Sequence, residues 1–317
     1  MLLRLLLIFN VVSLLSGCLS EPPTLLRIGT NIWPGYEPFY LAREYQWFQS
    51  EQIRLVEFGS AVDVMDALRQ GRLEGGGLTL DEALMLTAEG IDLTVVLVCD
   101  QSEGADVVMA KPEIQQLKDL QGKRIAAETS AVGALMLEST LQAAGMTMDD
   151  IQLVSLEPRE QLQAFEHNQL DAAVTFEPYK SRLARMGAHV LFSSKELPGQ
   201  ILDVLVVRTD ALERHQQALR YLIGAYFQAR EEILQANNNV LDILNRRLHL
   251  TRPELLNAYD GLILPTLEEN RSWLDTPPGR LHGRAVALAD LMYRQGLASS
   301  PDANIRTTAE LLPVPRS

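Results

Sequence analysis

The sequence is poor in cysteine and in positive charge, and each shortage excludes a class of protein. Only two cysteines occur in 317 residues, so the chain is not a small domain stapled by disulfides. Lys and Arg total 28 against 41 Asp and Glu, which gives a formal net charge of −13 at pH 7. Because proteins bind nucleic-acid phosphates through clustered Lys and Arg, we expect no nucleic-acid partner. The 47% hydrophobic and 22% charged residues are typical of a folded protein with one large or two medium domains.

The N-terminal segment lacks an apolar run long enough to cross a membrane. Its apolar stretch, residues 5–15, is interrupted by Asn10 and Ser13, whereas a hydrocarbon core requires about 20 residues. A single positive charge, Arg4, precedes this stretch. Residues 1–17 are therefore predicted to be a signal peptide.

Cys18 directly follows Leu15-Ser16-Gly17, and these four residues closely resemble the bacterial lipobox. We expect Cys18 to carry the lipid and residues 18–24 to form a polar linker, tethering the protein to a bacterial membrane in the periplasm or at the cell surface. The alternative is an ordinary signal peptide followed by an accidental cysteine. With Cys18 lipidated, Cys99 has no partner and is expected to be a buried small hydrophobic residue.

From Leu25 the sequence alternates short apolar runs with amphipathic stretches, the pattern of an α/β protein with parallel strands. The predicted strands are 26–29, 53–58, 93–99, 107–110, 124–127, 151–154, 172–174, 190–192 and 202–207. The predicted helices are 38–48, 62–70, 81–88, 131–144, 159–166, 178–185 and 212–236. Helical runs with few strand signals continue beyond residue 236.

The order of these elements indicates two lobes. Strand 107–110 is followed by a new α/β series, and strand 202–207 looks like the return from it. We expect lobe 1 to comprise residues 25–106 and 207–317, and lobe 2 residues 107–206. Two crossings form a hinge, and ligands of such folds favour the crevice at the carboxyl ends of the strands.

The segment Gly29-Thr30-Asn31-Ile32-Trp33-Pro34-Gly35-Tyr36-Glu37-Pro38-Phe39-Tyr40-Leu41-Ala42-Arg43 resembles the opening of a known family. This is the nitrate/sulfonate/taurine group of substrate-binding proteins of ABC importers, related to the pyrimidine-precursor binders of thiamine synthesis. Further matching segments are 78–84, 100–106, 122–125, 175–179 and 198–207. The resemblance implies a type II periplasmic-binding-protein fold with the helical C-terminal region packed on the first lobe. It also implies a monomer that delivers a small solute to an ABC permease in the membrane.

Three residues after the first strand are candidate ligand contacts. Trp33, Gly35 and Tyr36 lie between a predicted strand and a helix. Glycine there lets the backbone approach a ligand, and aromatic rings supply a rigid stacking wall. The alternative is that Trp33 and Tyr36 pack between the lobes or against the helix.

A second strand-to-helix junction contributes Thr79, Leu80 and Asp81 as candidates. Thr79 and Leu80 are expected to face the cleft. Asp81 and its neighbour Glu82 are equally consistent with capping and first-turn charges of the helix.

Lobe 2 contributes Thr129, Ser130 and Gly133 at the start of a predicted helix. The free N–H groups of that helix and the two hydroxyls suit an anionic group such as a sulfonate or a carboxylate. A plain helix cap by Ser130 is the alternative.

Carboxylates at strand ends and crossings complete the candidate set. Glu177 and Asp203 are candidate partners for an amine or a ring N–H, as is Glu128, and structural ion pairs or caps are the alternative for each. Three further acids flank the other crossing and are interpreted as solvated loop charges: Asp100, Glu103 and Asp106.

The candidate segments contain no obvious Arg or Lys. This balance favours a zwitterionic, cationic or heteroaromatic solute over nitrate or a simple dianion. We expect lobe 2 to contact the solute only after the lobes close.

The sequence contains no recognisable catalytic or metal-binding motif. No pair of cysteines offers a metal site, and the five histidines are scattered along the chain. These histidines are His167, His189, His215, His249 and His282. We therefore expect neither an enzyme nor a cofactor. Two alternatives remain open: a receptor that feeds a membrane signalling protein, and a pyrimidine-synthase-like enzyme, whose cytosolic branch should lack the export signal.

Overall fold

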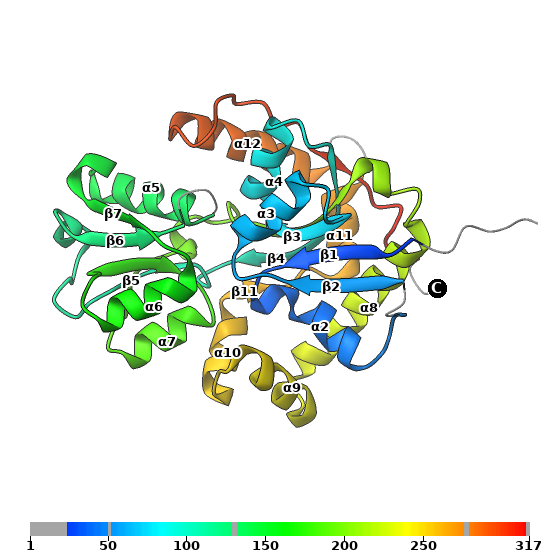
Figure 1. Ribbon diagram of the computed structural model, residues 1–317, viewed down its shortest axis with the longest axis horizontal. Helices are drawn as coiled ribbons and strands as arrows, with labels where there is room; N and C mark the ends of the chain where they lie inside the picture. The colour runs from blue at the N-terminus through cyan, green and yellow to red at the C-terminus, as the bar shows by residue number, and fades with distance from the viewer. Residues whose placement is uncertain (1–23, 50–51, 129–131, 276–278, 315–317) are drawn as a thin grey trace, which may run out of the picture.

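The computed structural model describes residues 24–49, 52–128, 132–275 and 279–314. These residues form two α/β lobes, each built on its own sheet (Figure 1). Cys18, Thr129 and Ser130 lie outside the described residues. No helix within those four ranges is long and apolar enough to cross a membrane.

Lobe 1 contains a seven-stranded mixed sheet in the order β11-β4-β10-β3-β1-β2, with β12 pairing to β4. Its strands are β1 (Leu26–Thr30), β2 (Ile53–Glu57), β3 (Gly75–Thr79), β4 (Leu93–Ser102), β10 (Leu202–Arg208), β11 (Leu262–Ile263) and β12 (Arg306–Thr307). The parallel strands β1 and β3 end at the edge that faces lobe 2 (Figure 1). Loops after these strands are therefore placed between the lobes.

Helices cover both faces of this sheet (Figure 1). From the first part of the chain come η1 (Pro34–Tyr36), α2 (Glu37–Glu44), α3 (Ala61–Arg69) and α4 (Leu80–Ala88). The C-terminal part contributes η5 (Thr209–Ala211), α8 (Gln216–Gln235), α9 (Asn238–Leu248), α10 (Arg252–Asp260), α11 (Leu267–Leu274) and α12 (Arg280–Arg294). Because α8 packs on α2, α11 on β4 and α12 on α4, the C-terminal helices belong to lobe 1, as expected.

Lobe 2 contains a five-stranded sheet in the order β7-β6-β8-β5-β9. Its strands are β5 (Val107–Ala110), β6 (Arg124–Ala127), β7 (Gln152–Ser155), β8 (Ala172–Thr175) and β9 (His189–Ser193). Its helices are η2 (Leu117–Leu120), α5 (Val132–Ala144), η3 (Met148–Asp150), α6 (Pro158–Glu166), α7 (Tyr179–Arg185) and η4 (Ser194–Glu196). The alternation of apolar runs and amphipathic stretches therefore correctly predicted the α/β structure of this lobe.

The return crossing lies earlier than the expected boundary at residues 206 and 207. β10 pairs antiparallel with both β3 and β4, so residues 202–206 belong to the sheet of lobe 1. The two crossings are tied together, because the hydroxyls of Ser102 and Ser194 lie 2.8 Å apart and the amide of Gly104 donates to Ser194 Oγ at 2.6 Å.

Asn270 of α11 replaces a missing strand partner along the outer edge of β4. Its Oδ1 accepts from the Val98 amide at 2.8 Å, and its Nδ2 donates to the Val98 carbonyl at 3.1 Å. β11 pairs with β4 near one end and β12 near the other, and the fully buried Asn270 fills the interval.

Replacing Asn270 with alanine is expected to lower the free energy of unfolding by about 2 to 4 kcal/mol, because two buried backbone groups lose their partners. Urea denaturation monitored by circular dichroism measures this loss. Asn238→Ala, on the exposed start of α9, is the matched control and should change stability by less than about 1 kcal/mol. Equal effects of the two variants would contradict the role given to Asn270.

Candidate ligand-binding cleft

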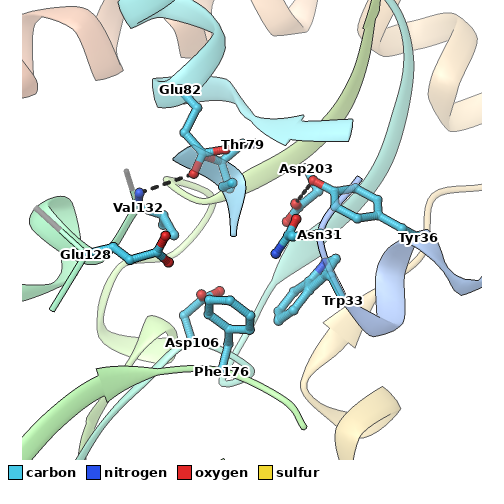
Figure 2. Close-up of a pocket in the computed structure, with 11 residues that line it drawn as sticks. Asn31, Trp33, Tyr36, Thr79, Glu82, Asp106, Glu128, Val132, Phe176 and Asp203 are labelled. Carbon is cyan, nitrogen blue, oxygen red and sulfur yellow. Dashed lines mark hydrogen bonds between the residues drawn. The ribbon is translucent and has the colours of Figure 1, made fainter. Parts of the chain in front are cut away.

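A cleft between the lobes encloses about 320 Å³ of empty space, part of it open to solvent (Figure 2). Both lobes and the first crossing contribute to its walls. The lining residues are Asn31, Trp33, Tyr36, Ala61, Thr79, Glu82, Asp106, Glu128, Val132, Phe176 and Asp203. As the lobes stand, little of this space is wider than a water molecule, so a bound solute requires the lobes or the lining side chains to move apart.

The aromatic wall comes from the turn after β1. The Trp33 indole donates through Nε1 to Asp100 Oδ2 at 3.0 Å, and Tyr36 Oη donates to Asp203 Oδ1 at 2.5 Å. Phe176 of lobe 2 packs edge-on against Trp33, with ring centroids 5.5 Å apart. One aromatic ring from each lobe therefore meets at the cleft.

Gly77 of β3 makes room for the Tyr36 ring. A Cβ on Gly77 would lie 2.8 Å from a carbon of that ring, closer than real contacts allow. The absence of a side chain at Gly77 thus lets the Tyr36 ring pack directly onto the sheet.

Three adjacent strands of lobe 1 place polar side chains side by side under that wall. Thr79 of β3 pairs in register with Asp203 of β10, which pairs with Asp100 of β4. Thr79 is also the N-cap residue of α4, and its amide donates to Glu82 Oε2 at 2.9 Å, whereas its own hydroxyl makes no cap hydrogen bond. This hydrogen bond holds the buried Glu82 side chain in the wall of the cleft.

Glu82 also reaches across to lobe 2. Its Oε1 accepts from the amide of Val132, the first residue of α5, at 3.5 Å. Elsewhere along the rims, Ser60 Oγ donates to Glu157 Oε1 at 3.2 Å, and Arg185 forms a bidentate ion pair with Glu254 at 2.7 and 2.6 Å. These contacts bring the lobes together as in a closed arrangement.

Burial raises the pKa values of the acids in the cleft. The pKa of Glu128 rises to about 7, with the nearby Glu157 and Asp63 adding to the effect of burial. Burial likewise raises the pKa of Asp106 to about 6, although Lys180 opposes this shift, and lifts that of Asp203 well above its ordinary value. Burial therefore favours the protonated, neutral forms of these acids.

Several polar atoms in the cleft also lack hydrogen-bond partners among the described residues. They are Thr79 Oγ1, Asp106 Oδ2 and Glu128 Oε1, and all three side chains are at least nine-tenths buried. Ionised carboxylates only accept hydrogen bonds. The two carboxylate oxygens are acceptors when ionised, the Thr79 hydroxyl can accept or donate, and the three atoms come from the first crossing, lobe 2 and lobe 1.

The structure brings together five of the residues singled out from the sequence. Trp33, Tyr36, Thr79, Glu128 and Asp203 all line the cleft. Gly35 packs behind it against the Asp100 carboxylate, and Leu80, Asp81 and Gly133 are buried beside it without lining it. Gly133 serves close packing, since a Cβ there would lie 2.7 Å from the Glu128 carbonyl oxygen.

Glu177 does not line the cleft. Its carboxylate accepts from Ser181 N at 3.2 Å and from Ser181 Oγ at 3.0 Å, and it lies 3.9 Å from Lys180 Nζ. These contacts stay within the start of α7 and give Glu177 a structural role, which the sequence left open as the alternative.

Asp106, in contrast to Glu177, lines the cleft although the sequence did not indicate it as a ligand contact. The interpretation as a solvated loop charge is wrong, because Asp106 is only 4% exposed and lines the cleft. The first crossing runs between the lobes, so a residue at its end is covered by both. Asp100 is likewise fully buried rather than solvated.

Other lining residues were not singled out as contacts although the resembling segments contain two of them. Asn31 lies two residues before Trp33, and Phe176 lies in the segment 175–179. Ala61 and Val132 carry no chemical signal in the sequence, since their place in the cleft follows from the packing of α3 and α5. Within the described ranges, no group of three or more His, Cys, Asp or Glu could hold a metal ion.

The fold and the cleft define a class: a two-lobed solute-binding protein with its candidate site between the lobes. The chain belongs to the NMT1-like family, whose model matches residues 20–243.

Curated relatives are binding proteins. The taurine-binding periplasmic protein of Escherichia coli (strain K12) is 26% identical over 211 residues, covering 64% of this chain and 65% of that protein, just under two thirds. A putative aliphatic sulfonates-binding protein of the same strain is 28% identical over 256 residues, covering 78% of this chain and 79% of that protein.

A solved structure supports the fold. The alkanesulfonate-binding protein from Xanthomonas axonopodis pv. citri, bound to MOPS, superposes with a TM-score of 0.73 at 22% identity. The match covers 90% of this chain and 97% of that chain. The expected two-lobed periplasmic-binding-protein fold is therefore confirmed.

Proposed function

We propose that this protein captures a small organic solute that carries positive charge and N–H donors, and delivers it to an ABC importer. The solute is held in the cleft between Trp33 and Tyr36 on one side and Glu128 on the other. Closure of the lobes around it presents a surface that the permease recognises.

The role in import is supported by the family and by its relatives. The curated relatives named above are binding proteins for taurine or aliphatic sulfonates, and periplasmic in the case of the taurine protein. The chain spans most of the length of the second relative. We infer the same extracytoplasmic location here, with a lipid on Cys18 as the anchor and the protein acting as a monomer.

The charge of the solute is inferred from the cleft itself. Glu82, Asp106, Glu128 and Asp203 line it, and none of its described lining residues is Lys or Arg. A sulfonate placed there would raise the pKa values of these acids further, and any acid that stayed ionised would repel it. A cation would instead lower the pKa values of these acids and compensate their burial.

The observation that carries the proposal is the set of unpartnered acceptors. Thr79 Oγ1, Asp106 Oδ2 and Glu128 Oε1 are buried in one cavity, and no donor from the described part of the chain reaches them. Buried polar groups in native proteins are nearly always hydrogen-bonded, so a bound solute is expected to donate to them. N–H groups on a planar cation would also fit against the Trp33 and Phe176 rings.

Isothermal titration calorimetry with a charge-matched panel tests this function. The panel comprises 4-aminopyridinium and putrescine as cations, taurine as a zwitterion, and methanesulfonate and nitrate as anions. We expect at least one cation to bind at least about tenfold more tightly than either anion, a difference of about 1.4 kcal/mol. Tight binding of nitrate or methanesulfonate alone would overturn the proposed ligand class while leaving the fold assignment intact.

A further inference from the structure

Asp100 and Asp203 form a pair of carboxyl groups directly beneath the aromatic wall. They are cross-strand neighbours on β4 and β10, and their residues are 0% and 4% exposed. Each accepts one hydrogen bond from the wall: Asp100 from the Trp33 indole and Asp203 from the Tyr36 hydroxyl, the second of which Figure 2 shows. No donor from the described residues reaches Asp100 Oδ1.

The groups that surround the pair are acidic or neutral. From each packed element these are Trp33 and Tyr36 of the η1 turn, Glu82 of α4, Cys99 of β4, Asp106 of the crossing, Tyr226 of α8 and Tyr259 of α10. The basic groups act on these neighbours: Lys180 on Asp106, Arg230 on Tyr226 and Arg247 on Tyr259. No described basic side chain is therefore placed to neutralise the pair.

We propose that Asp100 and Asp203 share one proton in the empty protein, and that a cationic solute bound against Asp203 displaces this proton to solvent. This step rests on the proposed ligand class. One positive charge enters the cleft and one leaves, so the charge of the buried site is conserved. Solute capture is then coupled to proton release, and affinity rises with pH.

Two adjacent buried carboxylates cannot both ionise without a counter-charge, which is the physical basis of the shared proton. Burial raises the pKa of Asp100 to about 7 and that of Asp203 well above its ordinary range, in the same direction. The two groups titrate as a pair, with one proton held far more tightly than the other.

Asp100 is a positioning residue in this arrangement. It does not line the cleft, but it holds the Trp33 indole through Nε1 and sits beside the carboxyl that does line it. A change in the protonation of the Asp100–Asp203 pair therefore affects the hydrogen bond that holds the Trp33 indole, as well as the net charge of the site.

The shared proton is tested first without any ligand. Carbon-13 NMR of protein labelled at the Asp carboxyl carbons follows both groups between pH 4 and pH 9, with Asp100→Asn and Asp203→Asn used to assign the signals. We expect one carboxyl of the pair to remain protonated at pH 7.5. Ionisation of both groups below pH 6 would overturn the shared proton whether or not the ligand class is correct.

The coupling is tested by calorimetry with 4-aminopyridinium in two buffers of different ionisation enthalpy at pH 7.5. We expect the wild type to release about one proton more per cation bound than Asp100→Asn, which supplies an amide hydrogen in place of the shared proton and retains only the partial release from Glu128. Asp210→Asn, at a side chain that is 75% exposed, is the matched control and should behave as the wild type. Absence of proton release in the wild type, or failure of 4-aminopyridinium to bind, would overturn the coupling. In either case the NMR titration would still decide the shared proton.

Discussion

Replacing Gly35 with alanine is expected to destabilise the protein by more than about 3 kcal/mol, at or beyond the upper end of overpacking effects. A Cβ at this position would lie 1.7 Å from Asp100 Oδ2 and 2.7 Å from Trp33 Nε1. The methyl group can be accommodated only if Asp100 or the Trp33 indole moves. Because both are buried in the wall of the cleft, movement there disrupts the hydrogen bond between them as well as the packing.

Urea denaturation of Gly35→Ala measures this loss, and a helical glycine provides the control. Gly283 lies in α12, and a methyl group added to it would meet no described atom within 4 Å outside its own helix backbone. Gly283→Ala should therefore be neutral or stabilising by up to about 1 kcal/mol. A Gly35→Ala variant within about 0.5 kcal/mol of the wild type would contradict the packing described for this turn.

Replacing Glu128 with glutamine is expected to raise stability and to weaken cation binding at the same time. The folded-state pKa of Glu128 is about 7, against an ordinary value of 4.5. The folded protein therefore holds a proton that the unfolded chain has lost, so stability falls as pH rises from about 4.5 to about 7. Glutamine cannot ionise, and this loss disappears.

The expected gain for Glu128→Gln at pH 8 is up to about 3 kcal/mol in the free energy of unfolding, with no gain at pH 4. Loss of a charged acceptor should weaken 4-aminopyridinium binding by about 10- to 100-fold. Thermal denaturation at pH 4, 6 and 8 together with calorimetry measures both effects.

Glu166→Gln is the matched control, because Glu166 is exposed on α6 of the same lobe. It should change neither the pH dependence of stability nor the affinity. A Glu128→Gln variant that is less stable at pH 8, or one that binds the cation normally, would contradict the role of Glu128. A structural acid is expected to lower stability when replaced, so the opposite signs of the two effects separate a binding role from a structural one.

Regular elements could be predicted from the sequence because periodicity reports them directly. The helices α3, α5 and α6 and most strands fall within a few residues of their predicted positions. β3 was not predicted, because Gly75, Gly76 and Gly77 have low strand propensity. The reason for a glycine at position 77 is the Tyr36 ring, which comes from a distant part of the sequence. The two-residue strands β11 and β12 are too short to produce a periodic signal.

The cleft could be predicted only where chemistry and position coincide. Trp33, Tyr36, Thr79 and Asp203 stand at strand ends or at the crossing and carry distinctive side chains. Asp106 resembles any solvated loop acid until the second lobe covers it. Glu177 stands at a suitable position, but its carboxylate accepts two hydrogen bonds from Ser181 of α7, the helix that follows it. Burial by distant segments is therefore the information that the local sequence lacks.

The way the outer edge of β4 is covered also bears on how the protein behaves at high concentration. An uncovered strand edge is a template on which another chain can add. Here β11, the Asn270 side chain and β12 together occupy that edge. The segment Arg306–Thr307 is thus part of a barrier to self-association, and a truncation that removes it would expose part of the β4 edge to pairing with another chain.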